Sequence, residues 1–100
     1  MELLNVRAKD GSRRFAALPQ TASWRTLRRH LEALAGVRLT DFLTDSVSEG
    51  WLDFTYGGQR FTVNDQFGQY WFFVDDSAAP DELLQRVAEY CNALLQAPAV

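Results

Sequence analysis

The sequence predicts an α+β domain in which two amphipathic helices pack on one face of a twisted antiparallel sheet of about five strands. Three observations support this. Two pairs of apolar segments flank the turn dipeptides Asp10-Gly11 and Gly57-Gly58, as in β-hairpins. Two longer segments carry apolar residues at helical spacing. Hairpins and helices in the order ββ-α-(β)-βββ-α are typical of a two-layer α+β sandwich.

The first predicted hairpin joins residues 3–8 and 12–18 through Asp10-Gly11. This dipeptide tolerates the positive φ angles of a two-residue type I′ turn. With such a turn, Val6 lies opposite Phe15 on one face of the hairpin.

The same register places Arg7 directly opposite Arg14 on the other face. Like charges opposed across strands cost about 0.2–1 kcal/mol unless an anion lies nearby. We therefore expect an anion beside this pair. Asp53 or another acid of the same chain could supply it, and so could a phosphate or an acidic partner.

The first helix is predicted over residues 22–35, with Thr21 or Ser23 as its N-cap and Gly36 as its left-handed stop. Its buried stripe consists of Trp24, Leu27, Leu31 and Leu34. Residues 37–48 could form a short strand, a loop or a helical turn.

The second hairpin joins residues 51–56 and 59–64 through Gly57-Gly58. A two-residue turn pairs Phe54 with Phe61 on the core face, and it pairs Leu52 with Val63 on the same side.

A third strand is predicted over residues 69–75, after a turn at residues 65–68. A four-residue loop pairs Val63 with Tyr70. The core face then continues through Phe72 and Val74, and Trp71 and Phe73 point to the other side, although a slip of one residue would reverse this. Trp51 joins Trp71 and Phe73 there, with Arg60 beside Phe73. Such an apolar patch usually marks a binding surface.

The second helix begins near Pro80, which suits a first helical position, and Asp81 and Glu82 complement the positive end of the helix dipole. Its apolar face consists of Leu83, Leu84, Val87, Cys91, Leu94 and Leu95. We expect residues 1–97 to form one domain, followed by a frayed tail at residues 98–100.

Composition excludes several classes of protein. With 47 % hydrophobic residues among 100, the chain can form a real core. No segment approaches the ~20 apolar residues of a membrane span. Residues 1–11 lack the basic and apolar regions of a signal peptide. A single cysteine forms no internal disulfide, so we expect a cytoplasmic protein.

The sequence contains no recognisable catalytic, cofactor-binding or metal-binding set. One histidine and one cysteine cannot supply a zinc site, and His30 is expected on a helix surface. Cys91 falls on an apolar helix face, where a thiol behaves as a small hydrophobic group. We therefore expect no enzyme activity, no cofactor and no metal.

Charge is divided unevenly along the chain. Residues 1–38 hold eight basic and three acidic residues, a balance of +5. Residues 39–100 hold two basic and ten acidic residues, a balance of −8. Such a division is typical of halves that attract each other, of an anion-binding half or of head-to-tail association.

These observations favour a non-catalytic protein-interaction domain: an accessory subunit, a chaperone-like or immunity-type protein, or a homodimer. Its expected partner is a protein or a second copy, without membrane contact. The expected contact residues are Trp51, Arg60, Trp71, Phe73, Arg7 and Arg14. The alternative is single-stranded nucleic-acid binding by stacking on the aromatic face, although the acidic second half repels phosphate.

Overall fold

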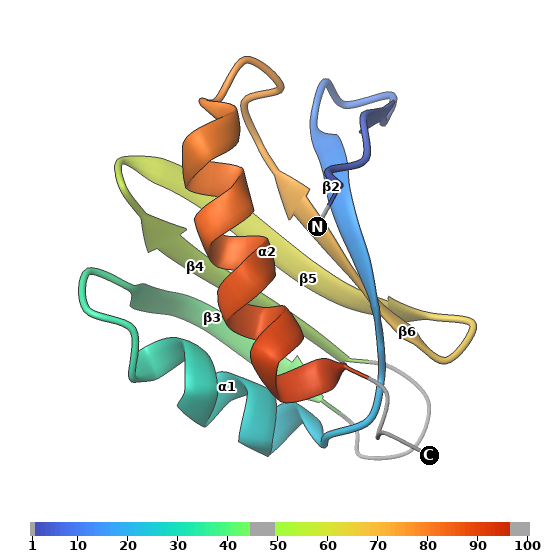
Figure 1. Cartoon of the computed structure of the whole chain (residues 1–100), viewed down its shortest axis with the longest axis vertical. Helices are drawn as coiled ribbons and strands as arrows, with labels where there is room; N and C mark the ends of the chain where they lie inside the picture. Colours follow the sequence, from blue (N-terminus) through green and yellow to red (C-terminus); the bar gives the residue numbers. More distant parts are fainter. Residues whose placement is uncertain (1, 45–49, 97–100) are drawn as a thin grey trace.

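A computed structural model describes residues 2–44 and 50–96, which form one antiparallel sheet and two helices (Figure 1). The elements are β1 (Val6–Arg7), β2 (Arg13–Pro19), α1 (Trp24–Glu32), β3 (Arg38–Thr44), β4 (Gly50–Tyr56), β5 (Gln59–Gln66), β6 (Gln69–Val74) and α2 (Asp81–Leu95). The sheet order is β1-β2-β6-β5-β4-β3. Both helices lie on the same face of the sheet. The predicted α+β architecture is confirmed, with six strands instead of about five.

The additional strand is β3, within the stretch that the sequence left open. Arg38–Thr44 pairs antiparallel with β4 and forms one edge of the sheet. The rest of that stretch, residues 45–48, lies outside the described residues, as does the predicted tail at residues 98–100.

The β1–β2 hairpin differs from its predicted register by one residue. Val6 pairs with Arg14, and Arg7 pairs with Arg13. The reason lies in the turn, where Gly11 has a φ of +90° and donates its N–H to the carbonyl of Ala8 at 3.1 Å. Asp10 keeps a negative φ, so the loop has three residues with glycine in the left-handed position. The predicted Arg7–Arg14 opposition is therefore wrong.

The β4–β5 hairpin has its predicted two-residue turn and register. Gly57 and Gly58 have φ angles of +59° and +80°, which glycine adopts without steric cost. Phe54 pairs with Phe61, and their rings stack with centroids 5.0 Å apart. Leu52 pairs with Val63 on the same face.

The β5–β6 hairpin is tighter than predicted. Its turn consists of Phe67 and Gly68, with φ angles of +52° and +77°, so Val63 pairs with Phe72 instead of Tyr70. This shift of two residues preserves the alternation of faces. The core still receives Phe72 and Val74. Thr62, not Arg60, lies opposite Phe73.

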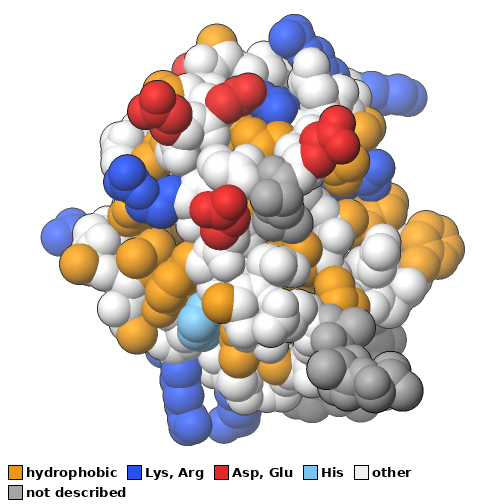
Figure 2. Space-filling view, viewed as in Figure 1, with side chains coloured by type: hydrophobic (Ala, Val, Ile, Leu, Met, Phe, Trp, Pro, Cys, Tyr) orange, Lys and Arg blue, Asp and Glu red, His pale blue; other side chains and the backbone are white. Residues whose placement is uncertain are grey.

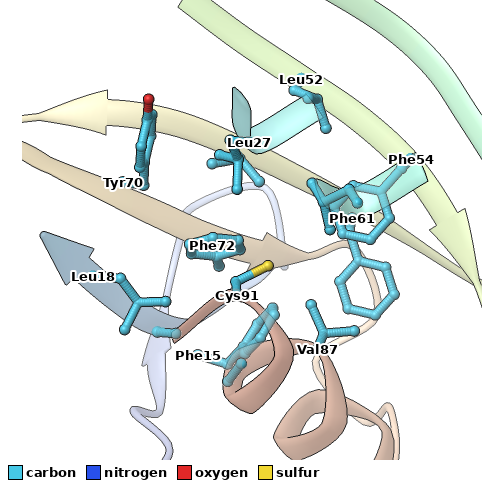
Figure 3. Close-up of a cluster of buried hydrophobic side chains, with 14 of the residues drawn as sticks. Phe15, Leu18, Leu27, Leu52, Phe54, Phe61, Tyr70, Phe72, Val87 and Cys91 are labelled. Carbon is cyan, nitrogen blue, oxygen red and sulfur yellow. The ribbon is translucent and has the colours of Figure 1, made fainter. Parts of the chain in front are cut away.

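The core lies between the sheet and the helices (Figure 3). Phe15 of β2 meets Phe61 of β5 edge to face, at 5.7 Å between ring centroids. From α2, Leu84, Val87, Cys91 and Leu95 are fully buried. From α1, Leu27 and Leu31 are fully buried, and Trp24 is nearly so.

The helix boundaries depend on their capping residues. Ser23 caps α1, accepting a hydrogen bond from the Thr26 N–H at 3.2 Å. The helix ends at Glu32, before its predicted limit, and Gly36 then has a φ of +94°. Pro80 has an extended ψ of 133° and is the N-cap of α2. The sequence predicted Pro80 as the first helical residue, so the helix begins one residue later than predicted, at Asp81.

Replacement of a ring at the centre of this core tests the packing. We expect Phe61→Ala to lower the free energy of unfolding by about 3–5 kcal/mol, because it removes the ring that contacts both Phe15 and Phe54. Arg60→Ala, an exposed neighbour on the same strand, should change it by less than about 0.5 kcal/mol. Chemical denaturation of both variants measures the difference. An equal loss of unfolding free energy in the two variants would contradict this account of the core.

Candidate functional site

The candidate site is the sheet face opposite the helices, here called the outer face. Within the described residues, neither the β1–β2 hairpin nor β3 covers this face. The β1–β2 hairpin and β3 extend the sheet at its two ends (Figure 1). The cross-strand pairs assign these residues, among others, to the outer face: Arg14, Arg38, Asp41, Trp51, Asp53, Thr55, Arg60, Thr62, Asn64, Trp71 and Phe73.

The three predicted aromatic residues lie together on this face. Trp51 pairs with Asn64, which pairs with Trp71 on its other side, so the asparagine separates two tryptophans. Trp51 is 45 % exposed. Trp71 and Phe73 are half-buried.

Arg14 contacts this group, whereas Arg60 lies on the same face without contacting it and Arg7 lies on the edge strand β1. The Arg14 guanidinium carbon lies 4.0 Å from the Trp71 ring centroid, a cation–π contact. Arg7 is exposed and opposes Arg13. Arg60 is also exposed, and its Nε lies 3.8 Å from a carboxylate oxygen of Asp75, not beside Phe73 as predicted.

Phe67, which the sequence analysis overlooked, extends the aromatic group. Its side chain is 91 % exposed, and its ring centroid lies 6.3 Å from that of Trp71. A bulky residue with a φ of +52° is strained, because this region favours glycine or asparagine. The sequence feature that could have identified Phe67 is an aromatic residue immediately before the glycine of a tight turn.

Two polar atoms near Trp71 are shielded from water without a hydrogen-bond partner. They are Nε of Arg14 and Oδ1 of Asn64. An unpaired buried polar atom typically costs about 1–3 kcal/mol. Such groups in a native structure call for an explanation.

Two carboxylates face each other at the β3 side of the outer face. Asp41 and Asp53 are cross-strand partners, a destabilising arrangement for like charges. Asp53 accepts a hydrogen bond from Oγ1 of Thr62 at 2.7 Å. Asp41 accepts one from the N–H of Phe42 at 2.9 Å.

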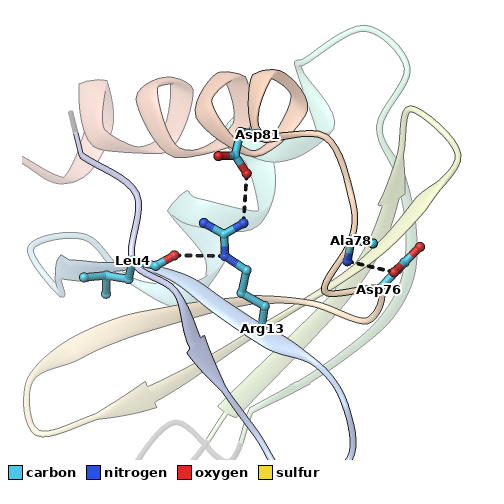
Figure 4. A network of polar contacts seen from close by, with 5 residues as sticks. All are labelled: Leu4, Arg13, Asp76, Ala78 and Asp81. Atoms are coloured by element: carbon cyan, nitrogen blue, oxygen red, sulfur yellow. Dashed lines mark hydrogen bonds and ion pairs between the residues drawn. The ribbon is translucent and has the colours of Figure 1, made fainter.

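On the helix side, Arg13 connects the basic and acidic parts of the chain (Figure 4). Its Nε donates to the Leu4 carbonyl, and its Nη1 contacts Oδ1 of Asp81, both at 2.9 Å. Arg13 is only 7 % exposed. No anion lies beside an Arg7–Arg14 pair, because that pair does not form. Asp81 neutralises Arg13 instead, and Asp53 is bonded to Thr62.

The surface over the helices shows the same division of charge in part. In Figure 2, the acidic side chains gather in the upper part of this view, whereas basic ones lie at the upper right and left and also project below α1. Arg25, Arg28, Arg29 and Glu32 line a shallow hollow there, and Arg28 is ion-paired with Glu32 at 2.9 Å.

His30 and Cys91 have structural surroundings. His30 is half-buried, not on the surface as predicted, and its ring stacks on Tyr90 with centroids 4.0 Å apart. Nε2 of His30 donates to the Tyr90 carbonyl at 2.7 Å, and the Tyr90 hydroxyl donates to the His30 carbonyl. Burial raises the pKa of the Cys91 thiol to about 12.

Within the part of the chain that the structure describes, no three histidine, cysteine or acidic side chains gather as metal ligands would. No helix there is long and apolar enough to span a membrane.

The comparisons with known proteins found no relative. No family model, no curated protein and no solved structure matches the chain.

Thiol labelling tests the assignment of Cys91 to the core. Its burial and raised pKa leave almost no thiolate at neutral pH. We expect a thiol reagent to label the native protein at least about a hundredfold more slowly than the protein in denaturant, because labelling requires opening of the core. Mass spectrometry over time measures both rates. Similar rates would contradict burial.

Proposed function

We propose that this chain is a non-catalytic protein-interaction domain that contacts its partner through the outer face. The observation that supports this most strongly is the group formed by Trp51, Phe67, Trp71 and Phe73, which neither helix covers. A soluble monomer rarely keeps a large contiguous apolar patch in water. Tryptophan and arginine are also the residue types that most often supply the energy of an interface.

The strained turn gives independent support. An exposed Phe67 contributes little to the stability of the isolated chain, and its backbone conformation costs free energy. Strain of this kind tends to occur at binding sites, where the side chain has a use that offsets it. Docking onto a partner protein is such a use.

The net charge of the chain, and the two carboxylates on the outer face, favour a protein over a nucleic acid. Arg14 and the tryptophans have the chemistry of a stacking platform for bases. Asp41 and Asp53 occupy the same face, however, and the chain carries a net charge of −3. Carboxylates repel phosphates, whereas a protein surface can offer them cations.

The side chains with catalytic potential support a non-catalytic role. Cys91 is buried and its pKa is raised, which is unfavourable for a nucleophile. Nε2 of His30 is engaged by a backbone carbonyl. A single cysteine also agrees with a reducing compartment, and we propose the cytoplasm.

Two substitutions test the proposed surface, because binding and stability should respond differently. We expect Phe67→Asn to weaken association while leaving thermal stability unchanged or higher, since asparagine tolerates a positive φ. Trp71→Ser should also weaken association and leave the thermal midpoint nearly unchanged. Affinity capture from cells of the source organism, with calorimetry of each purified variant, measures both properties. Arg25→Glu, on the exposed side of α1, is the control.

Two outcomes would contradict the proposal. A loss of several kcal/mol in Trp71→Ser, with association unaffected, would assign Trp71 to the core of a monomer. Sub-micromolar binding of a single-stranded oligonucleotide that is lost in Trp71→Ser would favour the nucleic-acid alternative.

A further inference from the structure

We infer that the occupant of the outer face is a second copy of this chain, related by a two-fold axis that lies in the contact plane along β5. This inference rests on the proposed function and specifies its partner. Its basis is the arrangement of two rows of outer-face residues, those through Thr62 and Asn64, which is self-complementary about β5. A two-fold interface requires a surface of this kind, because each residue contacts the position related to it by the axis.

Arg14 and the two carboxylates lie on opposite sides of β5, whereas Arg60 lies on β5 itself, beside its ion-pair partner Asp75. The pairing places Arg14, Phe73, Thr62, Asp53 and Asp41 in one row across β2, β6, β5, β4 and β3. Arg14 is therefore two strands from β5 on one side, and Asp41 is two strands from it on the other. Rotation about β5 brings Arg14 of each copy opposite Asp41 of the other, with Asp53 one strand further in.

This arrangement accounts for charges that the isolated chain leaves unbalanced. Within the described residues, Arg14 forms no ion pair and its guanidinium rests on the Trp71 ring. Asp41 and Asp53 repel each other across β3 and β4. A guanidinium from the second copy supplies a counter-charge to both carboxylates.

The next row has the same symmetry. Trp71, Asn64 and Trp51 follow one another across β6, β5 and β4. The axis therefore passes through Asn64, and it brings Trp71 of one copy opposite Trp51 of the other. Rotation of the Asn64 amide allows each copy to donate to the Oδ1 of the other, an atom that has no partner in the single chain. Paired polar residues at an axis fix the register of an interface.

The outer face reaches the lower size limit of a specific interface. Five strands about 4.8 Å apart, with residues rising about 3.3 Å each, give a plane of roughly 24 by 20 Å. The two planes together amount to about 1,000 Å², the size that a biological interface should reach. The exposed ring of Phe67 adds to this area at the end of β5.

Charge reversal and its rescue test this pairing in the full chain. We expect the wild type to dimerise in sedimentation velocity. Arg14→Glu and Asp41→Arg should each raise the dimer dissociation constant by about tenfold or more, because each places like charges opposite each other twice. The double variant Arg14→Glu, Asp41→Arg should recover most of the lost affinity. Arg25→Glu makes the same change of charge outside the face and should dimerise like the wild type. Calorimetry of each variant confirms folding.

Three results would overturn the inference. The wild type could stay monomeric up to millimolar concentration, the double variant could dimerise no more tightly than either single variant, or Arg25→Glu could raise the dissociation constant as much as Arg14→Glu does. These results are distinct from failure of the proposed function. If the chain is monomeric but another protein binds it and loses binding with Trp71→Ser, the outer face is still a contact surface and only the second copy is wrong.

Discussion

The architecture depends on one constraint: two helices cover a six-stranded sheet from one side only. Strands direct alternate side chains to opposite faces, so each strand that sends a ring into the core also presents residues away from it. On β6, Phe72 and Val74 fill the core while Trp71 and Phe73 lie outside. A sheet with large apolar side chains on both faces needs a cover on both, and within the described residues the chain supplies one.

The covered side is stabilised by contacts between distant parts of the sequence. The Phe15 ring from β2 reaches Phe61 on β5 because β2 pairs with β6, next to β5 in the sheet. Arg13, on the same strand, is held by Asp81 at the start of α2. The basic N-terminal part and the acidic C-terminal part are thus partly neutralised within one fold, and only some of the charge division remains for a partner.

Turn chemistry determined how well the sequence predicted the sheet. Gly57-Gly58 leaves one plausible turn, so the register of β4 and β5 was predictable residue by residue. At Asp10-Gly11 only the glycine adopts a positive φ, which added a loop residue and shifted the register by one. At Phe67-Gly68 the error was two residues, which preserves the faces. Trp71 and Phe73 were therefore assigned to the correct side despite the wrong loop.

The rest of the candidate surface depends on neighbours that alternation cannot identify. The stacking of Arg14 on Trp71 requires β2 to lie beside β6, an arrangement of strands distant in sequence. Asp41 could not be placed while residues 37–48 were open between strand and loop. Phe67 had a local signal, because a bulky residue in a tight turn is unfavourable unless its side chain has another use.

The most direct test of the contact surface is hydroxyl-radical footprinting of the three tryptophans, inside cells of the source organism and in dilute purified protein. Trp24 is 8 % exposed in the core and serves as the internal control, with low oxidation in both samples. If the outer face meets a protein, Trp51 and Trp71 should be several-fold less oxidised in cells than in the dilute sample. The oxidation of each sample is normalised to that of an exposed peptide outside this face. Equal oxidation of Trp51 and Trp71 in both samples would show that this face stays in water and would contradict the account.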